Sequence, residues 1–97
     1  MGNDSRELTS RDFARAIPRR QRERIARGKI AGGKDVAALR RFTGMTQVEF
    51  ADALGISVHT LRNWEQDRRS PEGPALALLR IAARHPGVLR ENLAVSA

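Results

Sequence analysis

Two short amphipathic helices, separated by a three-residue break, constrain the fold of this chain more than any other feature. Thr46 and Glu49 form a capping box, in which each side chain accepts a hydrogen bond from the other residue's backbone amide, so a helix is predicted to begin here. That helix is expected to run to Leu54, and Gly55 permits its left-handed exit. Ser57 then caps a second helix. Helices joined by so short a connection must cross at a steep angle.

The spacing of small and apolar residues in this pair is typical of a helix-turn-helix. Ala51 lets the backbones approach, Gly55 makes the turn four residues on, and Leu61 fills the angle six residues later. The second helix has the length and outward polarity that suit the DNA major groove. The first helix is expected to bury Val48, Phe50, Ala51 and Leu54; the second is expected to bury Leu61 and Trp64 and to expose Val58, His59, Arg62, Asn63 and Gln66.

A further helix is predicted before this pair. Asp35 is expected to cap it, and it should end near Thr43, where Gly44 permits a left-handed turn. Its inward residues are expected to be Val36, Leu39 and Arg40. The sequence therefore predicts an all-α domain over residues 35–97.

The segment after Pro71 predicts another helix over residues 74–85, with apolar residues on nearly all sides. Part of that apolar surface exceeds what one core needs. Together with the residues after the Pro86-Gly87 break, it predicts a two-fold dimer interface, with plain core filling as the alternative. The residues concerned are Leu76, Leu78, Leu79, Ile81 and Ala82, followed by Val88, Leu89 and Leu93.

The positive charge is concentrated at the N-terminal end. The 97 residues carry 18 Lys and Arg against 11 Asp and Glu, a formal net charge of +7. Residues 1–34 hold ten of the basic residues against four acidic ones, whereas residues 35–97 hold eight against seven. The first segment is poor in large apolar groups, so we expect a flexible, largely disordered basic arm, either solvated or folding upon a partner. A nascent helix could run over residues 19–27 of this arm. An anionic partner is indicated, with nucleic acid as the leading candidate.

Composition and motifs exclude several function classes. The chain has no cysteine, and His59 and His85 are too far apart in sequence to suggest a metal site. It shows no Ser/His/Asp grouping, no phosphate-binding glycine loop and no paired carboxylates in an apolar setting, so no enzyme and no cofactor are expected. No membrane-spanning run or secretory signal is present. We expect a cytoplasmic protein of the bacterial nucleoid.

The stretch over residues 46–71, TQVEFADALGISVHTLRNWEQDRRSP, resembles the helix-turn-helix of the lambda-repressor-like, or XRE, family. The pattern continues through PALALLRIA at residues 74–82 and His85-Pro86, and this longer match is similar to HigA-type antitoxins of toxin-antitoxin systems. The similarity covers roughly residues 35–93. It implies a five-helix all-α domain that binds, as a homodimer through its C-terminal helices, to a palindromic operator of double-stranded DNA. It also implies that the N-terminal arm binds a RelE-like toxin.

The resemblance assigns roles to residues at matching positions. Base edges would be contacted by Val58, His59, Arg62 and Asn63; the DNA backbone would be contacted by Gln47, Thr60, Gln66, Arg68 and Arg69. It also implies a buried ion pair between Glu65 and Arg40. One departure is that Gln66-Asp67 stands where the family often has Asn-Gly, which adds an acid near the DNA.

Two function classes remain open. In the first, the chain is an antitoxin whose arm binds the toxin through Phe13, Ile17, Arg19 and Arg20. In the second, it is a stand-alone repressor whose arm only adds phosphate contacts. Phe13 and Ile17 lie four residues apart, on one helical face, which favours the antitoxin. An RNA-binding adaptor is disfavoured because no aromatic stacking platform is present.

Overall fold

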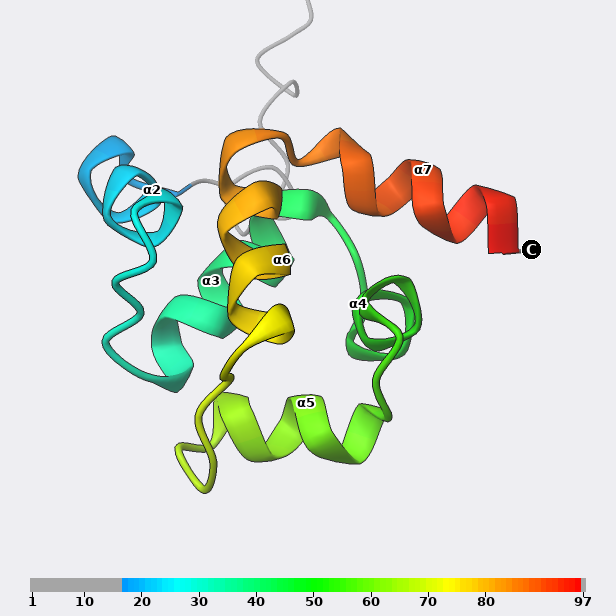
Figure 1. Ribbon diagram of the computed structural model, residues 1–97, viewed down its shortest axis with the longest axis horizontal. Helices are drawn as coiled ribbons and strands as arrows, with labels where there is room; N and C mark the ends of the chain where they lie inside the picture. Colours follow the sequence, from blue (N-terminus) through cyan, green and yellow to red (C-terminus); the bar gives the residue numbers. More distant parts are fainter. Residues whose placement is uncertain (1–16, 97) are drawn as a thin grey trace, which may run out of the picture.

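The computed structural model describes residues 17–96, and within this range it contains six helices and no strand (Figure 1). The helices are α2 (Arg19–Ala26), α3 (Gly33–Thr43), α4 (Gln47–Leu54), α5 (Val58–Glu65), α6 (Pro74–Arg84) and α7 (Gly87–Ser96). The five helices from α3 to α7 are those expected of the domain, and α2 corresponds to the nascent helix expected over residues 19–27. The all-α fold predicted from the sequence is confirmed.

Local capping sets the ends of the helices that build the turn. The Thr46 hydroxyl accepts from the Glu49 amide at 3.1 Å, and the Glu49 carboxylate accepts from the Thr46 amide at 2.9 Å. Gly55 ends α4 with φ 75°, in the left-handed region that glycine adopts without strain. The Ser57 hydroxyl then accepts from the Thr60 amide at 3.0 Å, which begins α5. The predicted capping box, glycine exit and serine cap are therefore all confirmed.

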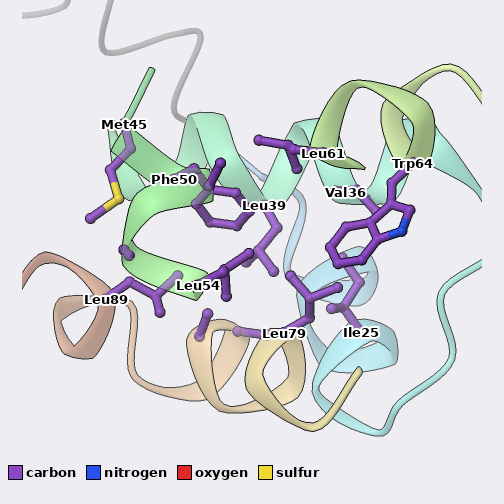
Figure 2. Packing of buried hydrophobic residues seen from close by; sticks show 14 residues of the cluster. Ile25, Val36, Leu39, Met45, Phe50, Leu54, Leu61, Trp64, Leu79 and Leu89 are labelled. Carbon is purple, nitrogen blue, oxygen red and sulfur yellow. The ribbon is translucent and has the colours of Figure 1, made fainter. Parts of the chain in front are cut away.

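One hydrophobic core receives residues from all six helices. Figure 2 shows Phe50 of α4, Leu61 of α5 and Leu79 of α6 converging on Leu39 of α3, and each of these four side chains is fully buried. Trp64 of α5 closes one side of this cluster and is buried as predicted. The position of α5 is therefore fixed by packing on its inner face.

Two burial and capping predictions are wrong. Val48 is 61% exposed instead of buried, because it lies two residues before Phe50 and so on the opposite side of α4. Ala53 joins the core in that helix. Asp35 is not a helix cap, since α3 begins at Gly33; its side chain is buried within the first turn.

The predicted arm over residues 1–34 differs from the structure in its second half. The helix α2 packs against α6 and α3, and Ile25 is fully buried in the core (Figures 1 and 2). The apolar residues of this segment are too few to order it alone, but α6 supplies their packing partner. Phe13 and the rest of residues 1–16 lie outside the described residues.

The helix predicted over residues 74–85 is observed as α6, ending one residue earlier. Leu79 and Ala82 are buried, whereas Leu78 and Ile81 are 37% and 43% exposed. On α7, Val88 is 41% exposed, while Leu89 belongs to the core. An apolar surface therefore does remain on α6 and α7, although it is smaller than the sequence suggested.

Candidate nucleic-acid interface

The helix α5 lies along one edge of the described part of the molecule, with its outer face uncovered (Figure 1). Ala51 and Leu61 are buried where α4 and α5 cross, as the spacing predicted. Of the predicted base-contacting residues, His59 and Arg62 are exposed, and Val58 and Asn63 are half-buried. The structure thus brings all four to one short helix with a solvent-accessible side.

The predicted backbone-contacting residues surround that helix. Gln47 begins α4 and is half-buried, and Thr60 is half-buried within α5. The other three follow the end of α5 and are exposed: Gln66, Arg68 and Arg69. The amides of Arg68 and Arg69 both donate to the Asn63 carbonyl, at 2.8 and 3.3 Å, which folds this exit loop back on α5. These hydrogen bonds hold Arg68 and Arg69 beside the C-terminal end of α5.

A polar network joins α3, α4 and α5 beneath this region. Arg40 Nε donates to Glu65 Oε2 at 2.8 Å, and both side chains are largely buried, at 15% and 9% exposed. The ion pair implied by the resemblance is therefore present. Gln47 Nε2 also donates to Glu65 Oε1 at 3.1 Å, and Arg62 Nε donates to Gln47 Oε1 at 3.2 Å. An exposed arginine is thus connected to the core through one amide and one carboxylate.

The acid in the loop that follows α5, Asp67, is exposed and forms a hydrogen bond to α3. Asp67 adopts a left-handed conformation with φ 62°, at the position where the family often has glycine. Its Oδ1 accepts from the Gly33 amide at 2.7 Å, at the N-terminus of α3.

A β-carbon on Gly33 would lie 2.3 Å from the Glu65 carbonyl oxygen, so only glycine allows this close approach of α3 to α5.

A second ionic cluster fastens α2 to α3. The Asp35 carboxylate accepts from Arg24 at 2.6 and 3.0 Å, from Gln21 at 2.8 Å and from the Ala31 amide at 2.7 Å. Burial opposes the ionisation of this carboxylate, but these hydrogen bonds and the Arg24 charge outweigh it and lower the pKa of Asp35 to about 2. The same hydrogen bond to Asp35 raises the pKa of Arg24.

The residues predicted to bind a toxin are only partly within the described chain. Ile17 is half-buried and packs against the core, and Arg19 and Arg20 are exposed on α2. The helix α2 packs against α6 and lies away from α5 (Figure 1). Within residues 17–96 no group of acidic, histidine or cysteine side chains is arranged to hold a metal ion. No helix of this range is long and apolar enough to cross a membrane.

Comparison with known proteins agrees with this geometry. The sequence profile of a helix-turn-helix family matches residues 36–82, which span most of α3, all of α4 and α5, and most of α6. Those residues form a helix-turn-helix domain of the XRE type. No solved structure matches the chain significantly.

Curated relatives match over part of their length. Antitoxin HigA-2 of Vibrio cholerae is 40% identical over 55 residues, which are 57% of this chain and 53% of the relative. An uncharacterized HTH-type transcriptional regulator of Escherichia coli K12, YiaG, is 32% identical over 57 residues, or 59% of each chain. The chain thus spans about half the length of the curated relatives it matches.

Sequence reasoning missed three contacts that shape this domain. These are the pairing of Asp35 with α2, the hydrogen bond from the Gly33 amide to Asp67, and the contacts of Gln47 within the protein. The pairs joining Arg24 to Asp35 and Gly33 to Asp67 involve residues 11 and 34 positions apart, so no local pattern signals them. The consecutive glycines Gly32 and Gly33 are the one sequence signal that could have indicated the close approach of α3 to α5.

Proposed function

We propose that this chain is a DNA-binding antitoxin of a type II toxin-antitoxin system, which neutralises a RelE-like toxin and represses its own operon at a palindromic operator. The observation that carries the DNA-binding part is the uncovered face of α5, which is held in place by the buried Leu61 and Trp64 and bears the exposed His59 and Arg62. The similarity to Antitoxin HigA-2 supports the antitoxin part.

On the operator, α5 would enter the major groove and the surrounding residues would contact the backbone. The Arg62 guanidinium suits guanine, the Asn63 amide suits adenine, and Val58 suits a thymine methyl group. His59 is the fourth base-contacting residue in this proposal. Phosphates would be bound by Gln47, Thr60, Gln66, Arg68 and Arg69, which fix the register without sequence preference.

A homodimer would place two such helices on the two halves of the palindrome. The exposed apolar side chains of Leu78, Ile81 and Val88 support an interface on α6 and α7. A two-fold dimer would set the half-sites about one helical turn, roughly 34 Å, apart.

The toxin would be bound by the N-terminal part of the chain. Arg19 and Arg20 are exposed on α2, and Ile17 adds an apolar group beside them. Phe13 completes the proposed anchor from outside the described residues. A stand-alone repressor without a toxin is the second candidate, and the similarity to a relative named as a transcriptional regulator supports it.

One experiment separates the two candidates. Three proteins would each be tested for operator binding at several salt concentrations: the full chain, Arg62→Ala, and a chain shortened to residues 17–97 in which the exposed Arg19 and Arg20 are also replaced by Ala. Each would also be tested for relief of the growth arrest caused by the product of the adjacent reading frame. The shortened chain keeps α2, so its core is retained.

For an antitoxin, we expect the shortened chain to lose the relief of growth arrest while keeping operator affinity and salt slope. We expect Arg62→Ala to show the reverse, with a loss of about 1–3 kcal/mol on the operator and little loss on random DNA. A shortened chain with weaker DNA binding, a salt slope lower by about 0.9 per lost phosphate contact and no toxin partner would instead establish the stand-alone repressor.

A further inference from the structure

The Gln47 side chain occupies a position between two charged groups of opposite hydrogen-bonding character. On one side lies the Glu65 carboxylate, which only accepts hydrogen bonds; on the other lies the Arg62 guanidinium, which only donates them. An amide between such groups satisfies both in one orientation only. Gln47 Nε2 must face Glu65 and Gln47 Oε1 must face Arg62, as observed.

The carboxylate that fixes this orientation is itself held in place. Glu65 is 9% exposed at its side chain, and Arg40 binds both of its oxygens, at 2.8 and 3.3 Å. Arg40 also donates to the Met45 carbonyl at 3.3 Å, just before α4 begins. The orientation of the Gln47 amide is thus determined from the buried side of the network and does not depend on solvent.

The contact with Gln47 uses one defined part of the Arg62 guanidinium. Nε donates to Gln47 Oε1 at 3.2 Å, and the two terminal Nη groups keep their four N–H donors. An arginine held by Nε can therefore present its Nη groups end-on, as a bidentate contact to guanine O6 and N7 requires. A flexible, exposed arginine without this contact would lose more side-chain entropy on binding.

We propose that Gln47 is a positioning residue for base recognition: by holding Arg62 Nε, it orients the arginine and thereby determines the preference for guanine at one base pair. This inference rests on the base-contacting role of Arg62 in the proposed function. The second hydrogen of Gln47 Nε2 is left for a phosphate oxygen, so the positioning role and the backbone contact use different atoms of the same amide.

The test compares base discrimination among variants of the full chain. Sites would first be selected from random duplex DNA with the unmodified chain, and the base pair whose preference disappears in Arg62→Ala would be identified. Affinities of Gln47→Met would then be measured on the selected site and on its single-base variants. Gln66→Met is the matched control, because it makes the same chemical change at an exposed residue beyond α5.

We expect Arg62→Ala to lose discrimination at its base pair by about 5- to 150-fold, the range that a bidentate contact supplies. Gln47→Met should lose the larger part of that discrimination at the same base pair while preserving it at the others. At this base pair, the double variant should lose no more discrimination than Arg62→Ala alone, because the two residues act through one contact. Gln66→Met should lower the affinity for all sites by the same factor.

The proposal is overturned if Gln47→Met lowers the affinity for every site by the same factor and keeps discrimination at the Arg62 base pair. Gln47 would then contribute a phosphate contact only. An unmodified chain that selects no sequence overturns both this inference and the proposed function. Thermal melting monitors folding of each variant. If Gln47→Met does not fold, Gln47→Ala serves instead, because it also removes the acceptor for Arg62 Nε and leaves the Arg62 guanidinium unchanged; retained discrimination at the Arg62 base pair in that variant overturns the proposal.

Discussion

The buried carboxylate of Asp35 makes a quantitative prediction about stability. It is 4% exposed and accepts four hydrogen bonds, two of them from Arg24. The change Asp35→Asn replaces the charged group by a neutral one of the same shape. The amide hydrogens of the asparagine would then face N–H groups that donate to the carboxylate in the unmodified chain. Arg24 would also lose its charged partner.

The magnitude follows from the pKa of Asp35, which falls from 3.8 to about 2 on folding. A depressed pKa stabilises the folded state above the unfolded value of 3.8, and this stabilisation is lost as the pH falls through the folded value. The shift corresponds to about 2 kcal/mol at neutral pH. We expect Asp35→Asn to lower the free energy of unfolding by at least that amount at pH 7, because the amide hydrogens face donors and leave them without an acceptor.

The assay is urea denaturation of the full chain and Asp35→Asn at equal concentration, at pH 7 and at pH 3. The stability advantage of the unmodified chain should shrink by about 1 kcal/mol between the two pH values, because the unfolded carboxylate then binds protons that the folded one does not. Asp52→Asn is the control, since Asp52 is exposed and should show no such change. An advantage that is equal at both pH values would refute an ionised, paired Asp35.

Two further substitutions test the contacts that hold α5. Glu65→Ala should lower the free energy of unfolding by about 3 kcal/mol, because Arg40 is left buried without its partner; Glu72→Ala, at an exposed residue, is the control, and an unchanged urea midpoint for Glu65→Ala would contradict the pairing. Gly33→Ala should lower the melting temperature by an amount equivalent to about 1–3 kcal/mol, because its β-carbon would overlap the Glu65 carbonyl oxygen. Gly87→Ala, where nothing lies within 4 Å, should melt at or above the temperature of the unmodified chain, and equal melting of both alanine variants would argue against the close approach.

The features that could be predicted from sequence are those determined over a few residues. The capping box at Thr46 and the left-handed exit at Gly55 depend on the chemistry of adjacent residues. The burial of Leu61 and Trp64 follows from helical spacing alone. For this reason the turn, the start of α5 and the exposure of His59, Arg62 and Gln66 were located correctly, whereas Val58 and Asn63, also predicted to be exposed, are half-buried.

The features that could not be predicted depend on contacts between distant segments. Ile25 is ordered because α6 covers it, so a count of apolar residues within the arm gave the wrong extent for the ordered chain. The start of α3 was misplaced for the same reason, since the Asp67 carboxylate that accepts from the Gly33 amide comes from the loop after α5. Asp35 could serve as a cap by its type, but the basic and amide side chains of α2 enclose it instead.

The structure also bears on the acid that departs from the family pattern. A carboxylate beside DNA would repel phosphates, but Asp67 Oδ1 lies 2.7 Å from the Gly33 amide, where the positive end of the α3 dipole stabilises negative charge. The other acid near α5, Glu65, is paired with Arg40. Glu65 is therefore largely buried, and Asp67, although exposed like Arg62, Arg68 and Arg69, is hydrogen-bonded to the N-terminus of α3. The local field at the exit of α5 is set by these exposed arginines, so the departure at Asp67 is compatible with a phosphate-binding loop and adds a tether that holds that loop to α3.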